Sequence, residues 1–564
     1  MEIKNKTLIL GAVLLAGAIL SSFLLLTVGD YSRAHTEYFT EIPDSNGQSL
    51  CYRVWGIPER APETQGEVII MFPGFSSQQE NMYPLMREFT MRGYNVITAD
   101  WRGQGKSGGI LPFDTEILVE DFDLVVEDAS VRYPDWNWTQ VTMIGHSMGG
   151  EAALAIGALR DVFNTIAVAP MPYITDIDPE VYNNLFVITG DKDQLIPVDG
   201  IFDWFQNIVP GAELGTFYGS FETSTMRAME VVPGANHEFI LADDVCIQHI
   251  VHFVLNSYGN QIEMNEIEIH QSLRVYGIFA SLIIGIIGIC AFCLGLKFQW
   301  TNIPEKEPQE SPEKRSLQEK NITLEEMTWK EFLKSYIVYL PLGFVFVMIL
   351  FAASLLTGGS FVSSQVIFLG LPGMIALVFL WRRTNTKEEN ASRLKLAWKD
   401  FWSQLTWKKL GLALICSIVS LILVVTTLGQ VYMYLFPLNL RILNSWFYFP
   451  VFLVSLWAQG WVFQEFLKQK EKDERTNQLW KAIGFILLLK FGIYYGLGLG
   501  ILLTGDLTIT LIGQLTMIDV IGTIFYILEV KRTGSMENFA IWTAICANFV
   551  YLGYSAFNIG FLAT

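Results

Sequence analysis

The sequence has little of what marks nucleic-acid-binding proteins, disulfide-rich domains and metalloproteins. Its 564 residues include 38 Lys and Arg against 56 Asp and Glu, a formal net charge of −18. Because phosphate binding requires basic surface, this shortage of positive charge argues against a nucleic-acid partner. The six cysteines are scattered without metal-ligand spacing, and only Cys51 and Cys246 lie outside apolar segments, which leaves room for one disulfide. We expect neither a metal nor a cofactor.

Charged residues are also scarce, at 17% of the chain, whereas hydrophobic residues make up 51%. The first long apolar run, Thr7 to Val28, follows Lys4 and Lys6 and is long enough to span a bilayer. The two lysines place the N-terminus in the cytoplasm. A cleaved signal peptide is the alternative interpretation, but the run is long for one and no clear small-x-small cleavage site follows it, which favours an uncleaved signal anchor.

The C-terminal half contains further apolar spans of transmembrane length, which bring the total to about nine. They lie near residues 273–296, 335–356, 361–381, 410–436, 446–466, 481–503, 508–528 and 538–560. Connections rich in Lys and Arg alternate along the chain with short links that carry only Arg441. By the positive-inside rule, the basic connections lie in the cytoplasm and the C-terminus lies outside. We therefore predict an integral protein of the cell membrane, whose all-α membrane domain could also support an oligomer.

This pattern divides the chain into five parts. They are a signal anchor (1–29), an extracytoplasmic domain (30–260), a second transmembrane helix with its approach (261–300), a charged cytoplasmic linker (301–332) and a membrane domain of about seven helices (333–564). Within the last part, Lys490 and Asp519 fall at similar depths, so we expect an ion pair that joins two helices. Gly492, Gly496 and Gly500 have the spacing of a helix-packing face.

Residues 30–260 have the composition of a soluble domain. Short apolar runs alternate with helical patterns, which predicts a mostly parallel sheet flanked by helices. Strands are expected at Glu67–Phe72, Asn95–Ala99, Val141–Ile144, Thr165–Ala169, Leu185–Thr189 and Met226–Val231. Helices are expected at Asn81–Arg92, Glu116–Arg132, Glu151–Leu159 and Asp243–Leu255.

The stretch Gly145-His146-Ser147-Met148-Gly149 lies between an expected strand and an expected helix. Glycines two places before and after a serine at a strand-to-helix turn form the nucleophile-elbow pattern. Side chains at those positions would collide with the neighbouring strand and helix, and the following helix directs free N–H groups toward the serine. The pattern predicts that Ser147 is a nucleophile.

A serine nucleophile needs a base, and the base needs an acid that orients it. Asp193 lies in a turn just after the expected strand Leu185–Thr189, and His237 lies in a loop between the last strand and the last helix. Chain order Ser, Asp, His at successive strand ends is that of a triad hydrolase. We therefore predict Asp193 as the acid and His237 as the base. Asp191 is the rival acid, but it lies nearer the strand.

An oxyanion produced at Ser147 needs two N–H donors. One is expected from the amide of Met148, which follows the nucleophile. The other is expected from the turn after the first strand, where Gly74 lets the backbone approach and the amide of Phe75 is available. Pro73 has no N–H and cannot serve.

These motifs, together with Asp100 to Ser107, resemble the α/β-hydrolase superfamily, and within it the branch of monoacylglycerol lipases, lysophospholipases and serine aminopeptidases. The resemblance covers about residues 65–255. It implies an eight-stranded sheet and acyl transfer to water, with Ser147, Asp193 and His237 as the triad and Phe75 and Met148 as oxyanion donors. One departure is Pro73, where this family commonly has His.

The segment Asp100 to Ser107 is expected to brace a loop beside the site. Lipases of this branch usually carry a helical cap between their sixth and seventh strands, but here the corresponding segment, Pro170 to Asn184, is too short for a full cap. A longer insertion, Gln206 to Thr225, carries Phe217, Tyr218 and Phe221, which we expect to line a pocket or to touch lipid.

The sequence therefore predicts a membrane-bound serine hydrolase that cleaves a carboxylester, with a lipid or lysolipid as the favoured substrate. Two alternatives stay open. One is a peptidase or amidase of the same fold, and the other is a non-catalytic ectodomain on a transporter-like membrane protein.

Overall fold

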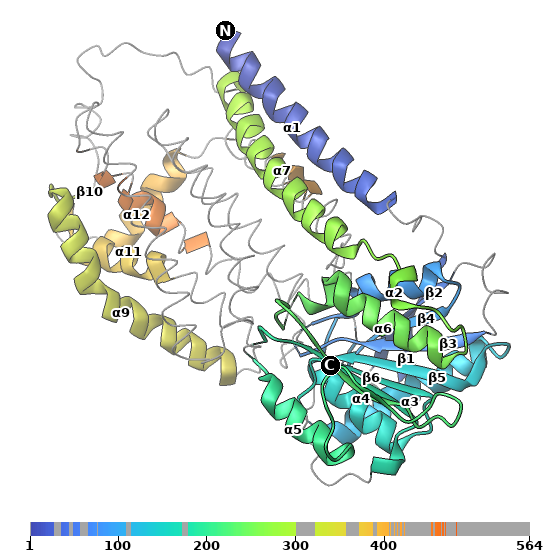
Figure 1. Ribbon diagram of the computed structural model, residues 1–564. Coiled ribbons are helices and arrows are strands. Elements are labelled where there is room, and N and C mark those ends of the chain that lie inside the picture. The colour runs from blue at the N-terminus through green and yellow to red at the C-terminus, as the bar shows by residue number, and fades with distance from the viewer. Residues whose placement is uncertain are drawn as a thin grey trace.

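The computed structural model describes residues 2–27, 35–43, 49–56, 66–300, 322–356, 371–386 and 392–404, with scattered residues between 407 and 481. Within 66–300, the positions 76, 106, 109–113, 172–178, 194 and 238 lie outside the description. Figure 1 shows the described residues as a sheet domain (residues 35–270), two long helices that rise from it, and a group of helices beside them.

Over the residues that the structure describes, the sheet of this domain has nine strands. They are β1 (His35–Pro43), β2 (Ser49–Gly56), β3 (Glu67–Phe72), β4 (Asn95–Asp100), β5 (Asn137–His146), β6 (Asn164–Val168), β7 (Asn184–Gly190), β8 (Phe217–Tyr218) and β9 (Arg227–Val232). The helices are α2 (Tyr83–Met91), α3 (Thr115–Arg132), α4 (Met148–Leu159), α5 (Val198–Ile208) and α6 (Asp244–Ser257). Short 3-10 turns are η3 (Gln79–Met82), η4 (Pro179–Val181), η5 (Ile240–Ala242) and η6 (Met264–Glu266).

The strands are ordered β1-β2-β4-β3-β5-β6-β7-β9-β8. From β4 to β9 all neighbouring strands are parallel, whereas β1, β2 and β8 pair antiparallel with their neighbours. The ends of the parallel strands are in register, with His146 beside Val168 and Gly190 beside Val232. Segments that follow β5, β7 and β9 therefore emerge at the same edge of the sheet.

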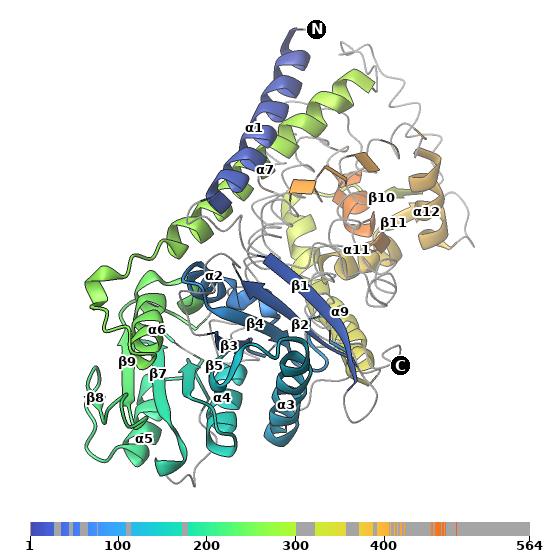
Figure 2. The same cartoon turned by 90° about the vertical axis from the view of Figure 1, so that its right-hand side faces the viewer.

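Helices cover both faces of the sheet, with α2 and α6 on one side and α3, α4 and α5 on the other (Figure 2). Alternation along β3 divides its side chains: Ile69 and Met71 pack with α2 and α6, while Val68, Ile70 and Phe72 pack with α3 and α4. All six residues of β3 and of β4 are buried, as expected for strands covered on both faces.

The six strands expected from the sequence are all present, and β3 has the expected bounds. The expected helices are present as α2 with η3, α3, α4 and α6. The strands β1, β2 and β8 and the helix α5 were not expected from the residue pattern. The resemblance implied eight strands, and the sheet has nine because the two-residue strand β8 pairs with β9 at its edge.

The two long helices are α1 (Glu2–Thr27) and α7 (Gln271–Trp300), which run side by side as a helix pair (Figures 1 and 2). Small residues allow the close approach: a Cβ on Gly11 would lie 2.2 Å from the main-chain nitrogen of Phe292, and a Cβ on Gly288 would lie 2.8 Å from that of Leu15. Closer to the sheet domain, the hydroxyls of Ser21 and Ser281 are 2.7 Å apart and hydrogen-bonded.

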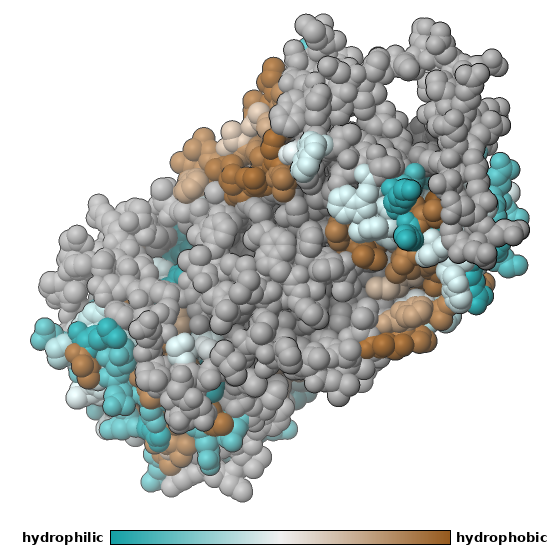
Figure 3. Space-filling view, turned by 180° about the vertical axis from the view of Figure 1, so that it is seen from behind, coloured by the Kyte–Doolittle hydropathy of each residue, from teal (hydrophilic) through white to brown (hydrophobic). Residues whose placement is uncertain are grey.

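Among the described residues, two segments are long and apolar enough to cross a membrane, Lys6–Leu25 and Gln271–Ile289. They belong to the helix pair, whose outer face is apolar in Figure 3. Helices α9 (Trp329–Leu356) and α11 (Leu371–Arg382) coincide with all or part of two more expected spans. The spans expected at 410–436 and 446–466 are described only at scattered residues. The last three, with Lys490, Asp519 and Gly492 to Gly500, lie outside the described residues, apart from Lys481.

The segment predicted as a linker, 301–332, has secondary structure at its C-terminal end. Ile322–Leu324 form the strand β10, which pairs with β11 (Thr384–Thr386), and α9 begins at Trp329. Ile322 and Leu324 are 2% and 3% exposed, so their burial offsets the cost of ordering this segment. α12 (Arg393–Gln404) completes this group of helices.

Candidate active site

Ser147 lies at a sharp turn between β5 and α4. Its backbone has φ 56° and ψ −118°, a conformation that a residue with a side chain rarely adopts. The turn is tightly packed, because a Cβ on Gly145 would lie 1.8 Å from the carbonyl oxygen of Gly149. The sequence thus forms the expected elbow, and α4 starts at Met148 directly behind the serine.

The structure brings the three expected side chains together, although 90 residues separate Ser147 from His237 and 44 separate Asp193 from His237. The Ser147 hydroxyl donates to Nε2 of His237 over 2.9 Å, and Nδ1–H of His237 donates to Oδ2 of Asp193 over 2.7 Å. The other carboxylate oxygen of Asp193 accepts from the amides of Leu195 and Ile196 at 2.9 and 2.8 Å. The side chains of His237 and Asp193 are 1% and 0% exposed.

Asp193 and His237, the expected acid and base, lie in loops that are hydrogen-bonded to each other. The amide of Lys192 donates to the carbonyl of Ala235 over 3.0 Å, and a Cβ on Gly190 would lie 2.1 Å from the same oxygen. Asp191, the rival acid, accepts from the amide of Gly234 instead. Its side chain is 38% exposed, so it serves as a loop clamp while Asp193 receives the imidazole.

The turn that was expected to supply an oxyanion donor packs directly on the nucleophile. A Cβ on Gly74 would lie 2.9 Å from the Cβ of Ser147, so only glycine fits there. Residues after β4 hold this turn: the indole of Trp101 donates to the carbonyl of Pro73 over 2.8 Å, and Gln104 donates to that of Gly74 over 3.2 Å. The expectation that Asp100 to Ser107 braces a loop beside the site is confirmed.

Arg102 joins the same brace to α3. Its main-chain amide and its Nε donate to the two carboxylate oxygens of Asp121 over 2.9 and 2.6 Å. Burial raises the pKa of Asp121 to about 6 even though the bonds from Arg102 lower it. The bracing loop is therefore fixed to the sheet domain at a second, buried point.

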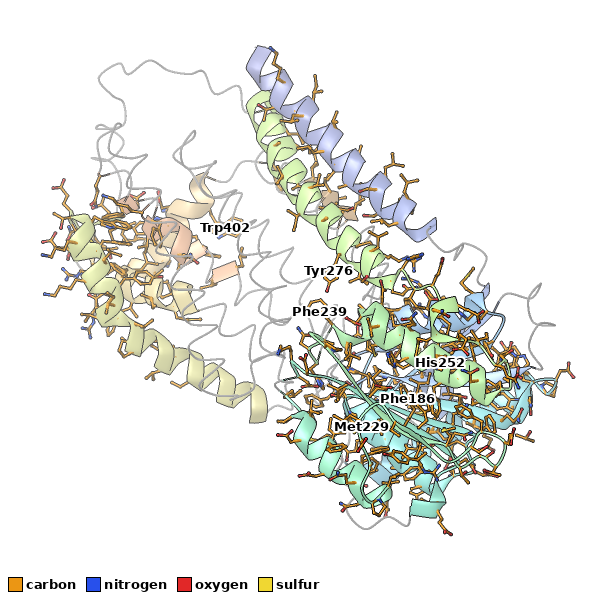
Figure 4. All side chains as sticks on the ribbon, viewed as in Figure 1. Phe186, Met229, Phe239, His252, Tyr276 and Trp402 are labelled. Atoms are coloured by element: carbon orange, nitrogen blue, oxygen red, sulfur yellow. The ribbon has the colours of Figure 1, made fainter. Side chains whose placement is uncertain are left out.

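The insertion Gln206 to Thr225 does not cover the site. It runs from the end of α5 through β8, at the far edge of the sheet. There the rings of Phe217 and Phe221 pack against Phe253 of α6 at centroid distances of 6.3 and 5.1 Å. Phe221 is partly buried and packs against the core, and the expectation that these aromatic side chains line a pocket or touch lipid stays a prediction. Figure 4 shows the α6 side chains of this region around His252. Cys51 and Cys246 are both buried and are not joined by a disulfide.

Sequence reasoning passed over His146, which precedes the nucleophile. Its Nε2–H donates to the main-chain carbonyl of His237 over 2.9 Å, and the two ring centroids are 4.9 Å apart. Burial, and to a smaller extent the charge of His237, lowers the pKa of His146 to about 3. The signal in the sequence was a histidine at the position directly before Ser147.

Comparisons with known proteins relate part of the chain to hydrolases. Residues 63–191 match the model of the family described as "Serine aminopeptidase, S33". A Haemophilus influenzae protein named "Putative esterase/lipase" is 30% identical over 129 residues, 22% of this chain and 42% of that protein. The "Monoacylglycerol lipase" of Mycolicibacterium smegmatis is 31% identical over 114 residues, 20% of this chain and 38% of that protein. The strand order of the sheet domain is that of the α/β-hydrolase fold, and we call it the hydrolase domain.

This hydrolase domain is the sheet domain defined above, and the matches support the prediction that the chain is a hydrolase. The chain spans only about two fifths of the length of the curated relatives it matches. Among solved structures, a CIB-like hydrolase of Thermoplasma acidophilum is 20% identical, with 39% of this chain and 100% of that one covered at a TM-score of 0.31. An esterase of Pyrococcus furiosus is 19% identical, with 41% and 96% covered at a TM-score of 0.32. At these TM-scores, the fold assignment depends on the strand order of the chain itself.

Proposed function

We propose that this chain is a membrane-bound serine hydrolase that cleaves a carboxylester through an acyl-serine intermediate. The observation that carries the proposal is the buried series of hydrogen bonds from Ser147 through His237 to Asp193 at the carboxyl edge of the sheet. In this series each group has a role: Ser147 is the nucleophile, His237 the general base and Asp193 the acid that orients it.

In the proposed reaction, Nε2 of His237 takes the hydroxyl proton as Oγ of Ser147 attacks the carbonyl carbon of the ester. Asp193 keeps the second ring proton on Nδ1 and stabilises the imidazolium. The amides of Phe75 and Met148 are the proposed donors to the oxyanion, which is consistent with the close packing of Gly74 on Ser147. The C–O bond then breaks, His237 protonates the departing alcohol, and water repeats the cycle on the acyl-serine.

A lipid or lysolipid is the proposed substrate, and two observations support it. Relatives of the domain are named as an esterase/lipase and a monoacylglycerol lipase. The helix pair has an apolar outer face with exposed side chains such as Leu20, Phe23 and Ile287, which suits hydrocarbon. In this proposal the pair and the later spans hold the hydrolase domain at the outer surface of the cell membrane, with the N-terminus in the cytoplasm.

Labelling by a fluorophosphonate probe on isolated membranes tests the mechanism. The wild-type protein should be labelled and Ser147→Ala should not be. Ser147→Ala, Asp193→Asn and His237→Ala should each lower ester turnover by roughly 10⁴-fold or more, and the double variants should lose no more than the single ones, because the three groups act as a unit. An unlabelled wild-type protein would favour the non-catalytic ectodomain.

A second experiment addresses the substrate and the orientation. Membranes are supplied with p-nitrophenyl esters, lysolipids and aminoacyl amides, and the values of kcat/KM are compared. Faster turnover of amides would favour the peptidase alternative. The specific basis for that alternative is the match to the serine aminopeptidase family. A Glu213→Cys variant, substituted at an exposed position, should react with an impermeant maleimide in intact cells if the domain lies outside.

A further inference from the structure

The loop that carries the base is held at a point that the proposed reaction does not use. His237 bonds to Asp193 and Ser147 through its two ring nitrogens, while its main-chain carbonyl accepts from Nε2–H of His146 over 2.9 Å. His146 and Ser147 are neighbours in the chain, so the elbow contacts the base twice, once through each residue. His146 is 5% exposed and His237 is 1% exposed, which keeps water from competing for this bond.

The bond to a carbonyl fixes the state of the His146 ring. Because a carbonyl oxygen only accepts, the proton of neutral His146 is on Nε2, and Nδ1 carries a lone pair. Within the described part of the chain, Nδ1 has no hydrogen-bond partner, and it lies 3.2 Å from the place that a Cβ on Gly74 would take. The Nε2 side of the ring therefore contacts the loop that carries His237, and the Nδ1 side lies next to the turn at Gly74.

From this juxtaposition we propose that His146 is a positioning residue for the reaction. It ties the main chain at His237 to the elbow, so that the base stays aligned with Ser147 while its ring gains and loses a proton. The inference depends on the proposed serine-hydrolase function. It adds a residue that touches neither the substrate nor the reacting atoms.

The physical need for such a tie arises within the catalytic cycle. When His237 is protonated, its bond to Ser147 is exchanged for one to the leaving group, so a ring contact that orients it is temporarily lost. The main-chain bond does not change with the charge of the His237 ring. His146 stays neutral beside the imidazolium because burial lowers its own pKa to about 3.

The sharpest test replaces His146 by two residues whose side-chain amides differ in length, glutamine and asparagine. The amide nitrogen of His146→Gln can take the place of Nε2 and donate to the same carbonyl, whereas that of His146→Asn falls short at the position of Nδ1. We measure kcat and KM for a soluble p-nitrophenyl ester with the full-length protein in detergent. The rates are divided by the number of sites that a fluorophosphonate labels at completion, so unfolded protein does not count.

We expect His146→Asn to lower kcat by about 10- to 100-fold with little change in KM, since a small misplacement of a catalytic group has effects of that size. His146→Gln should recover most of the loss. The midpoint of the pH–rate profile should move in His146→Asn and stay near the wild-type value in His146→Gln. A merely structural role would lower the number of labelled sites. It would leave the kcat values of the two variants and the midpoint of the pH–rate profile unchanged.

Equal kcat values for the two variants would overturn the proposal, whether both match the wild type or both are equally impaired. If His146→Asn yields no folded protein, the kcat of His146→Gln decides alone: a value within about 3-fold of wild type supports the tie, and a loss beyond about 10-fold contradicts it. An inactive wild-type protein would instead count against the proposed function.

Discussion

The glycines of the elbow lie so close to the neighbouring backbone that replacing them should lower the reactivity of Ser147. A Cβ on Gly145 would lie 1.8 Å from the carbonyl oxygen of Gly149. Gly145→Ala should therefore displace α4 from β5 and move Ser147 away from His237. We expect the rate of fluorophosphonate labelling to fall by about 100-fold or more, because catalysis depends on placement within about 1 Å.

Gly200 on α5 is the matched control, since nothing lies within 4 Å of the place its Cβ would take. Gly200→Ala should label at the wild-type rate and should be more stable by about 0.5–1 kcal/mol, because alanine restricts the unfolded chain. A Gly145→Ala protein that labels as fast as Gly200→Ala would show that the elbow tolerates a shift.

At the scale of single residues, the sequence indicates which side chains come together at the site. It says less about the contacts that hold them in place. Ser147, Asp193 and His237 could be predicted because each follows a buried strand, and parallel strands end at one edge of the sheet. The bond between His146 and the carbonyl of His237 could not. It joins positions 91 residues apart through a main-chain atom that every residue possesses.

Among the individual elements, η3 and β2 enclose a carboxyl group whose state should control stability with pH. Glu80 is 1% exposed and lies 3.4 Å from the guanidinium of Arg53. Burial raises the pKa of Glu80 from its ordinary 4.5 to about 8; Arg53 opposes this rise, and Asp100 adds to it. The folded protein therefore keeps a proton that the unfolded chain releases above pH 4.5.

The stability that this proton contributes is fully present below pH 4.5 and is lost as the pH rises toward about 8. We expect the Tm of the wild-type protein to fall relative to that of Glu80→Gln between pH 5 and pH 8.5, measured by tryptophan fluorescence in detergent. Glu116→Gln, at the exposed start of α3, should run parallel to the wild type. A constant difference between Glu80→Gln and wild type at all pH values would refute the assignment.

Buried strands could be predicted from the sequence more easily than half-exposed ones. The central strands β3, β4 and β7 are continuous apolar runs bounded by turn residues, and all three were expected. The edge strands carry a mixed pattern, since β2 is Ser49–Gly56 with partly exposed residues and β8 has two residues. Such short or half-exposed strands are determined by their pairing with neighbours, which a local pattern does not contain.

The helix pair offers a prediction with two glycines on one helix. A Cβ on Gly11 would lie 2.2 Å from the backbone of Phe292, whereas nothing lies within 4 Å of one on Gly17. In a protein with Ser21→Cys and Ser281→Cys, whose hydroxyls are 2.7 Å apart in the native chain, mild oxidation should form a disulfide. Adding Gly11→Val should reduce the cross-linked tryptic peptide seen by mass spectrometry, and adding Gly17→Val should not. Equal yields would mean that the two helices do not pack through Gly11.

At the scale of the whole molecule, the hydrolase domain lies in the chain between the two members of the helix pair, and α1 and α7 contact each other close to this domain, at a junction that includes Leu25 and Arg274. Ser272, at the start of α7, donates from its amide to Asp244 of α6 over 2.8 Å. Ala242 of η5 packs with Val275 and Ile278 of α7. Phe239, which precedes η5 on the loop that carries His237, lies at the edge of the domain that faces α7 (Figure 4). The helix pair and the loop that carries His237 are therefore parts of one packed structure.

Arg274 joins the components of this junction. Its guanidinium donates from Nε to the carbonyl of Leu25 on α1 over 3.0 Å and from Nη1 to Gln271 over 2.8 Å, and Gln271 donates to Glu88 of α2. Because Arg274 is 1% exposed, its removal would leave buried acceptors without a donor. The guanidinium also lies at the last turn of α1, where a positive charge is favourable.

Arg274→Met should consequently destabilise the full-length protein by about 3 kcal/mol, which corresponds to a drop in Tm of about 6–12 °C for a unit of this size. Arg132→Met is the control, since Arg132 forms an exposed pair with Asp128 over 2.7 Å and should cost less than about 1 kcal/mol. Thermal unfolding of both variants in the same detergent measures the difference. Because Arg274 joins α1 to α7 and α2, its loss should also expose α1 to limited proteolysis before the hydrolase domain unfolds. Similar Tm values for the two variants would mean that the helix pair and the hydrolase domain are stable independently of each other.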